Sequence, residues 1–190
     1  MLDLQTYDVI TILSDMTERL GTDIGGVLAA HATLEFLEQP GRHLAVPEIE
    51  GSFNAIRQLR EERFGDETYV ISTCNEDIEV RSREWLAHTS FVERTGVGWG
   101  NIIYCRTFAE KAQIAGRLGL THFVDDRLEV MVGFNNGEKL YLFQPDEQKS
   151  APFSQHANKV QEVWSWREII ADILNRPNEN EGKMGNQTFS

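Results

Sequence analysis

The sequence predicts a three-layer α/β domain, in which helices cover both faces of a Rossmann-like parallel sheet. Short apolar segments rich in β-branched and aromatic residues alternate with segments whose apolar residues recur at helical spacing. Strands that alternate with helices in this way favour a parallel sheet. Polar residues directly follow several of the strand segments, at the positions where such sheets bind ligands.

The first half of the chain supplies four expected elements. Apolar residues within 7–16 predict a short N-terminal helix, and 20–24 predicts a strand that ends at the glycine pair beginning with Gly25. The apolar pattern of 27–37 predicts a helix. Phe53, Ile56 and Leu59 recur at helical spacing, so 53–59 predicts an amphipathic helix.

The second half continues the alternation. Segment 68–72 (TYVIS) is rich in β-formers and predicts a strand, and 79–87 then predicts a helix. Segment 101–105 (NIIYC) predicts the next strand. It is followed by an expected helix over 109–118, and Gly119 stands at the position of a helix C-cap.

Three more elements close the expected domain. Segments 121–124 (THFV) and 140–143 (LYLF) are short and apolar and predict strands. Segment 163–174 has the spacing of an amphipathic helix.

The chain length predicts one domain with short flanking segments. The 190 residues are 41% hydrophobic and 25% charged, which is ordinary for a globular protein. We expect a helical extension over 1–17, an α/β domain over 18–175 and a tail over 176–190. The tail is polar and rich in Gly and Asn, so we expect it to be disordered.

The charge and the cysteine content narrow the class of protein. Lys and Arg total 18 against 30 Asp and Glu, a net charge of −12, which disfavours generic nucleic-acid binding. No apolar run is long enough for a membrane span, and the N-terminus lacks the pattern of a secretory signal. Two cysteines are too few for a disulfide framework. We therefore expect a cytoplasmic protein without a membrane segment.

Acidic residues follow two of the expected strands. Asp23 comes at the end of the first strand, and Asp125 and Asp126 directly follow the fourth. The carboxyl ends of parallel strands meet at one edge, so the three side chains should lie close together. Three clustered carboxylates repel one another unless a cation neutralises them, and Mg2+ prefers such oxygen ligands.

Hydroxyls and a lysine complete the pattern. Ser72 and Thr73 follow the second strand, and Lys111 lies near the start of the expected helix 109–118. Either hydroxyl can donate to a phosphate oxygen, while the lysine supplies a positive charge. The sequence therefore predicts a site that clamps a phosphoryl group between Mg2+ and an ammonium group.

The order of these residues resembles the four-motif pattern of the haloacid dehalogenase-like (HAD-like) superfamily. The matching segments are TDIGGVL, YVISTCN, FAEKAQIAGRLGL and THFVDDRLEVM, between Gly21 and Val132. The resemblance implies a Mg2+-dependent phosphohydrolase or phosphoryl-transfer enzyme that acts on a phosphorylated substrate. The segments between the motifs are short, which suits a type with a minimal cap over the site.

The resemblance also implies roles for individual residues. Asp23 matches the nucleophile that becomes an aspartyl-phosphate, and Lys111 matches the charge that steadies nucleophile and phosphate. Ser72 matches the hydroxyl that binds the phosphate, with Thr73 as the alternative register. The implied metal ligands are Asp23, the backbone carbonyl of Gly25, Asp125 and Asp126.

Gly25 departs from the family pattern. Family phosphatases usually carry there a second Asp, which protonates the leaving group, and such a proton transfer contributes about 10²–10⁴-fold. Its absence predicts slow turnover, reliance on a good leaving group, or a replacement acid, for which His31 and Glu35 on the following helix are candidates. The alternative is a catalytically weakened member that binds a phosphorylated ligand or a protein partner.

A second resemblance competes for the same segment. The sequence DIGG at Asp23 to Gly26 is similar to the phosphate loop of sugar kinases and actin-like ATPases. In that family a Thr and then a β-hairpin follow, whereas Val27 follows here. The chain is also short for a two-lobed fold, so we favour the first resemblance.

Overall fold

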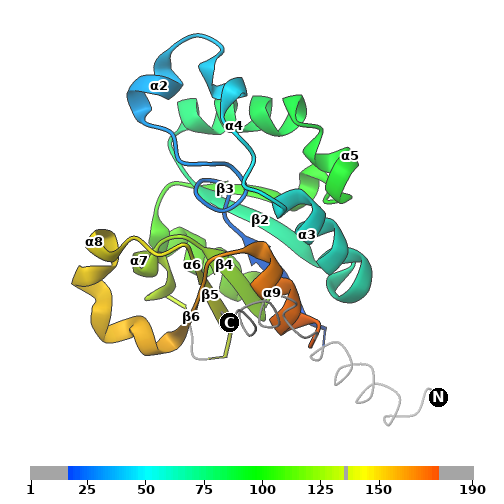
Figure 1. Ribbon diagram of the computed structural model, residues 1–190, viewed down its shortest axis with the longest axis vertical. Helices are drawn as coiled ribbons and strands as arrows, with labels where there is room; N and C mark the ends of the chain where they lie inside the picture. Colours follow the sequence, from blue (N-terminus) through cyan, green and yellow to red (C-terminus); the bar gives the residue numbers. More distant parts are fainter. Residues whose placement is uncertain (1–16, 135–136, 176–190) are drawn as a thin grey trace, which may run out of the picture.

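The computed structural model describes residues 17–134 and 137–175. Within them, six strands form one parallel sheet flanked by helices (Figure 1). The strands are β1 (Leu20–Thr22), β2 (Thr68–Thr73), β3 (Ile102–Cys105), β4 (His122–Asp125), β5 (Lys139–Phe143) and β6 (Val160–Val163). Their order in the sheet is β3-β2-β1-β4-β5-β6. The predicted three-layer fold is confirmed.

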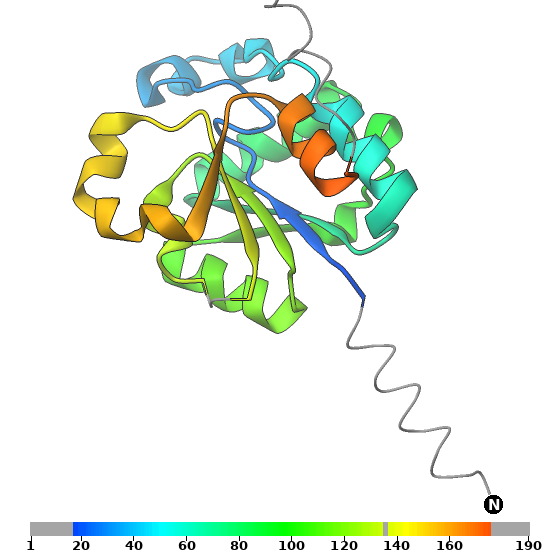
Figure 2. The same cartoon turned by 60° about the horizontal axis from the view of Figure 1, so that its bottom comes forward.

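Helices cover both faces of the sheet (Figure 2). One face carries α3 (Ser52–Leu59), α4 (Glu76–His88), α5 (Phe91–Thr95) and α9 (Trp166–Ile173). The other carries α6 (Phe108–Leu118), α7 (Leu128–Met131), α8 (Glu147–Ser150) and the 3-10 helix η4 (Ala151–Lys159). The shorter elements are α2 (Leu34–Glu38), η1 (Arg42–Ala45), η2 (Arg60–Phe64) and η3 (Trp99–Asn101).

The strands feed two hydrophobic cores, one beneath each helical layer. On β4, Phe123 packs in the core under α6 while Val124 packs in the core under α3 and α9. On β5, Leu140 and Tyr141 divide in the same way. Successive side chains of a strand point to opposite faces, so a strand covered on both sides is apolar throughout. This explains why the strand segments read as continuous apolar runs.

The predicted helix over 27–37 is wrong. The chain instead makes a tight turn after β1, in which the Ile24 carbonyl accepts hydrogen bonds from the amides of Leu28 and Ala29 at 2.9 Å each. Isolated bridges join Ala29 to Gly25 and to Glu48. Val27 and Leu28 are fully buried, so tertiary packing overrides the helical pattern.

The helix that does form is shorter and begins later. α2 starts at Leu34, with Thr33 as its N-cap, whose Oγ1 accepts from the Phe36 amide at 3.2 Å. The side chains at 31 and 35 therefore do not share a helix. β1 is followed by a crossover to the parallel strand β2 and not by a hairpin, which agrees with setting the actin-like resemblance aside.

The C-terminal part of the domain differs from the prediction in one strand and one helix boundary. The strand β6 was not predicted, because Gln161 and Glu162 break its apolar pattern; both are exposed on a strand at the edge of the sheet, where polar residues are normal. The last helix accordingly begins at Trp166 and not at Val163. The predicted helix 7–16 and tail 176–190 lie outside the described residues. Within those residues, no helix combines the length and apolar character that a membrane span needs.

Candidate active site

The ends of β1 and β4 lie side by side at the carboxyl edge of the sheet. β1 ends at Thr22, so Asp23 is the first residue beyond it, and its amide donates to the Val124 carbonyl at 3.0 Å. Asp125 is the last residue of β4. β1 and β4 are adjacent, with successive chain segments leading away to opposite sides of the sheet. Open α/β sheets bind ligands at such a switch point.

Lys111 reaches both carboxylates from α6. Its Nζ lies 3.0 Å from Oδ1 of Asp23 and 2.7 Å from Oδ2 of Asp125. A capping box between Thr107 and Glu110 starts α6 and sets the position of the lysine in the first turn. The lysine side chain is only 1% exposed, so the two carboxylates compensate its buried charge.

The third carboxylate leaves the cluster with excess negative charge. One oxygen each of Asp23, Asp125 and Asp126 lie within 4.8 Å of one another, whereas Lys111 offers a single positive charge. Oδ1 of Asp126 is buried and accepts no hydrogen bond from any described residue. Leaving such an oxygen without a partner is costly. Three hard oxygen donors with an unsatisfied buried atom fit a divalent cation such as Mg2+.

Burial changes the proton affinities of this cluster. It raises the pKa of Asp125 to about 7, against the opposing effect of Lys111. Burial and the charge of Asp23 raise the pKa of Asp126 to about 6. Burial alone lowers the pKa of Lys111, but Asp125 and Asp23 outweigh it, so this pKa is raised and the ammonium persists. A bound cation would favour the ionised carboxylates.

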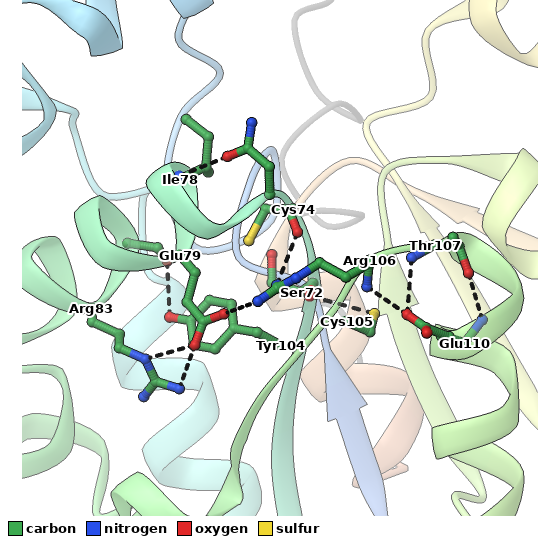
Figure 3. A network of polar contacts seen from close by, with 12 residues as sticks. Ser72, Cys74, Ile78, Glu79, Arg83, Tyr104, Cys105, Arg106, Thr107 and Glu110 are labelled. Carbon is green, nitrogen blue, oxygen red and sulfur yellow. Dashed lines mark hydrogen bonds and ion pairs between the residues drawn. The ribbon is translucent and has the colours of Figure 1, made fainter.

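Ser72 and Thr73 end β2, and both line the cavity in front of the carboxylates. The Thr73 hydroxyl forms a hydrogen bond with Sγ of Cys105, at 3.2 Å. Cys105 also contacts Ser72, but only its carbonyl, at 3.5 Å (Figure 3). Within the described ranges no hydrogen bond engages the Ser72 hydroxyl. Of these two hydroxyls, that of Ser72 is therefore the one left free to bind a ligand.

The two glycines after Asp23 differ in the space around them. A Cβ on Gly25 would meet no atom within 4 Å, so this position has room for a side chain. Gly26 has φ +76°, and a Cβ there would lie 2.6 Å from Cε1 of His31 and 2.8 Å from Cγ of Asp126. Only glycine lets the backbone pass so closely.

The two candidate replacement acids lie in different places. His31 lines the cavity, and its Nε2 is 3.2 Å from Oδ2 of Asp126. Burial and the charges of Lys149 and Arg127 lower the pKa of His31. Glu35 is exposed on α2 and does not line the cavity. The geometry therefore favours His31 over Glu35 as a proton donor.

A cavity of about 500 Å³ opens in front of these side chains. Asp23, Ser72, Lys111 and Asp125 form its polar floor. Trp85 lines a wall, and its indole Nε1 donates to the Val46 carbonyl at 2.9 Å, which ties α4 to the segment after β1. The apolar lining consists of Ile24, Leu34, Leu37, Val46, Ile78, Trp85, Phe108 and Val130. The volume suits a small organic ligand.

Arginines in the cavity wall were not among the predicted site residues. Arg81 comes from α4, Arg106 directly follows β3, and Arg127 follows Asp126. Ile78 and Arg81 are three residues apart on one helix, which is the spacing of a shared face. The sequence carried that signal, but nothing in it indicated that this face of α4 borders the site.

Comparison with known proteins bears on the fold. No family model and no curated protein matches the chain. Among solved structures, DsGPDH of Dunaliella salina is similar at a TM-score of 0.51 and 17% identity, over 86% of this chain and 30% of that one. The chain thus spans less than a third of that protein. At this identity the likeness supports the α/β fold alone.

Two other solved structures are more weakly similar. The HAD domain of effector protein Lem4 from Legionella pneumophila has a TM-score of 0.45 and 11% identity, over 84% of this chain and 95% of that one. A de novo designed Rossmann 3x3 fold protein has a TM-score of 0.40 and 15% identity, over 90% and 98%. Both TM-scores lie below 0.5, so neither likeness bears on function.

Proposed function

We propose that this chain is a Mg2+-dependent phosphohydrolase or phosphoryl-transfer enzyme of the HAD-like type, with Asp23 as its nucleophile. The position of Lys111 carries the proposal, because its Nζ lies 3.0 Å from Asp23 and 2.7 Å from Asp125 inside a cluster of three carboxylates. The residues come from the four sequence segments on which the resemblance rests.

Each residue has a task in this proposal. Asp23, the Gly25 carbonyl, Asp125 and Asp126 would hold Mg2+, which when bound neutralises charge on a phosphoryl group. Lys111 holds the Asp23 carboxylate in place through its 3.0 Å contact, and offers a further N–H to a phosphoryl oxygen. Ser72, whose hydroxyl is unengaged by the described residues, donates to a second oxygen.

The chemical step follows from the nucleophile. A carboxylate oxygen of Asp23 attacks phosphorus, and the ester oxygen leaves with the bonding electron pair. Water then attacks the aspartyl-phosphate and releases inorganic phosphate, or an acceptor hydroxyl takes the phosphoryl group. Gly25 has no proton to give to the leaving oxygen, so esters with good leaving groups should react fastest.

The small segment between β1 and α3 supports a minimal cap. It contains α2 and η1, and it contributes Leu34, Leu37 and His43 to one side of the cavity. The Trp85 hydrogen bond and the Trp166 indole, which donates to the Val27 carbonyl at 3.0 Å, anchor this segment. We therefore propose that it shapes the substrate site.

Phosphate release from p-nitrophenyl phosphate with Mg2+ tests the proposal. Wild type should hydrolyse the ester, while Asp23→Asn should fall to background. Asp77→Asn is a matched control, because Asp77 is exposed on α4 and lies outside the cavity. Equal rates for wild type and Asp23→Asn would refute a nucleophilic role for Asp23.

Gly25 favours a second candidate function, a weakened member that binds a phosphorylated ligand without turnover. A Cβ at position 25 would meet no atom within 4 Å, so Gly25→Asp is a suitable variant for introducing the missing acid. Activity that appears only in Gly25→Asp would identify the natural chain as a binder. Activity in the wild type, lost with Asp23→Asn, would exclude this alternative.

A further inference from the structure

Two of the basic residues that line the cavity already have an anionic partner. The Arg106 guanidinium donates to Oε2 of Glu79 at 2.7 Å and to the Cys74 carbonyl at 3.0 Å (Figure 3). Lys111 is paired with two carboxylates. These groups are satisfied before any ligand arrives.

Arg81 and Arg127 are different. Arg81 lines the cavity from α4 and is partly buried, yet no carboxylate or other acceptor in residues 17–134 and 137–175 engages its side chain. Arg127 lines the cavity from beyond β4, with its guanidinium carbon 5.6 Å from the centre of the Phe108 ring. No described carboxylate forms an ion pair with it. In a chain of net charge −12, two guanidinium groups that line one cavity and form no ion pair with a described residue suit an anionic ligand.

The cavity is also larger and more apolar than a phosphoryl group requires. Its volume of about 500 Å³ is in the range of sites for whole organic molecules. Leu37, Ile78 and Val130 offer apolar surface beside the polar floor. An apolar ligand body would gain from covering this surface.

We propose that the substrate carries a second anionic group, a carboxylate or another phosphate, joined to its phosphoryl group by an apolar body. Arg81 and Arg127 bind this second group, because a guanidinium pairs with carboxylate or phosphate oxygens through two parallel hydrogen bonds. The proposal rests on the proposed function, which assigns the phosphoryl group to the floor of the cavity at Asp23, Ser72 and Lys111.

One competing explanation is that both arginines bind the phosphoryl group itself. In that case their removal would weaken every phosphate ester equally. If they bind a second anion, their removal would weaken only esters that carry one. Substrates that differ in this charge alone therefore separate the two explanations.

The test uses 4-(2-carboxyethyl)phenyl phosphate and its neutral carboxamide, and the shorter 4-carboxymethyl acid with its own amide. Methylene groups insulate the phenol, so acid and amide share nearly the same leaving group. With Mg2+, at least one acid should exceed its amide in kcat/KM by about tenfold or more, the size of one hydrogen bond to a charged group. Arg81→Gln and Arg127→Gln should lower this ratio toward one, with acid and amide compared within the same variant.

Arg57→Gln is the matched control, because Arg57 is exposed on α3 outside the cavity, and it should keep the wild-type ratio. The second-anion site would be overturned if the wild type gave acid-to-amide ratios of kcat/KM near one for both lengths. It would also be overturned if the variants lost kcat/KM equally for acid and amide. In either case, turnover of the esters would still support the proposed function. If no ester is hydrolysed, calorimetric binding to the wild type is compared instead. An acid preference that depends on Arg81 then supports the site without the reaction, and no binding at all overturns both.

Discussion

Nζ of Lys111 lies 2.7 Å from Oδ2 of Asp125, and the two side chains are 1% and 0% exposed. The same nitrogen lies 3.0 Å from Oδ1 of Asp23. A buried ion pair is stable only when its charges compensate one another, because each has lost its hydration. The contact between Lys111 and Asp125 therefore contributes to the stability of the fold as well as to the proposed chemistry.

Replacing Lys111 with Met should destabilise the protein by about 3–5 kcal/mol, because it leaves buried carboxylates without a counter-charge. Urea unfolding without and with Mg2+ measures this, and Mg2+ should recover part of the loss. Lys159→Met, at an exposed position, should have little effect. A Lys111→Met protein as stable as wild type without Mg2+ would contradict the assigned ion pairs.

The effect of Mg2+ on stability should grow with pH. The pKa values of Asp125 and Asp126, about 7 and about 6, lie above their ordinary value of 3.8, so the folded chain binds more protons than the unfolded one. The stability of the metal-free protein should therefore fall as the pH rises from about 4 to about 7. Mg2+ binds the ionised form and should raise the melting temperature more at pH about 8 than at about 5. A larger rise at the lower pH would contradict this cluster as the metal site.

The two adjacent glycines should respond differently to alanine. At Gly26 a Cβ would collide with His31 and Asp126 at a φ of +76°, so Gly26→Ala should cost about 1–3 kcal/mol and weaken Mg2+ binding. At Gly25 the added methyl meets nothing within 4 Å, so Gly25→Ala should keep both properties. Thermal unfolding measures the stability of both variants, and a Mg2+ titration measures their affinity for the metal. Equal changes in stability and Mg2+ binding for the two variants would contradict the close contacts assigned to Gly26.

His31→Gln tests whether His31 supplies the proton that Gly25 cannot. The variant should slow hydrolysis of an alkyl phosphate by up to about 10²-fold, because an alkoxide must be protonated as it leaves. Hydrolysis of p-nitrophenyl phosphate should change little, since p-nitrophenolate leaves without a proton. Glu35→Gln, exposed on α2, is the control. Equal loss with both esters would indicate that His31 positions Asp126 and does not transfer a proton.

The sequence predicted the sheet well because its strands are buried on both faces. Burial on both sides demands continuous apolar residues, as in β4 and β5, and such runs are readily recognised. In the edge strand β6, Gln161 and Glu162 are exposed, so the segment has no continuous apolar run and was not predicted as a strand. The turn after Asp23 was mistaken for a helix, because Val27 and Leu28 are buried by distant contacts that local periodicity does not record.

The site residues also include some that the sequence predicted and some that it did not. Asp23, Lys111 and Asp125 were predicted as candidates and lie together, because each follows or adjoins a strand end whose place the parallel topology determines. Arg81 was not predicted, since its approach to the cavity depends on how α4 packs. The preference for the Ser72 hydroxyl over that of Thr73 likewise required the contact of Thr73 with Cys105.

A crystal structure with Mg2+ and beryllium fluoride, a mimic of the phosphoryl group, tests the central proposal most directly. The account predicts a fluoroberyllate joined to a carboxylate oxygen of Asp23, with Mg2+ on Asp125 beside it and the Lys111 ammonium opposite. Mg2+ and fluoride bound elsewhere, or a site that stays empty at saturating concentrations of both, would contradict it.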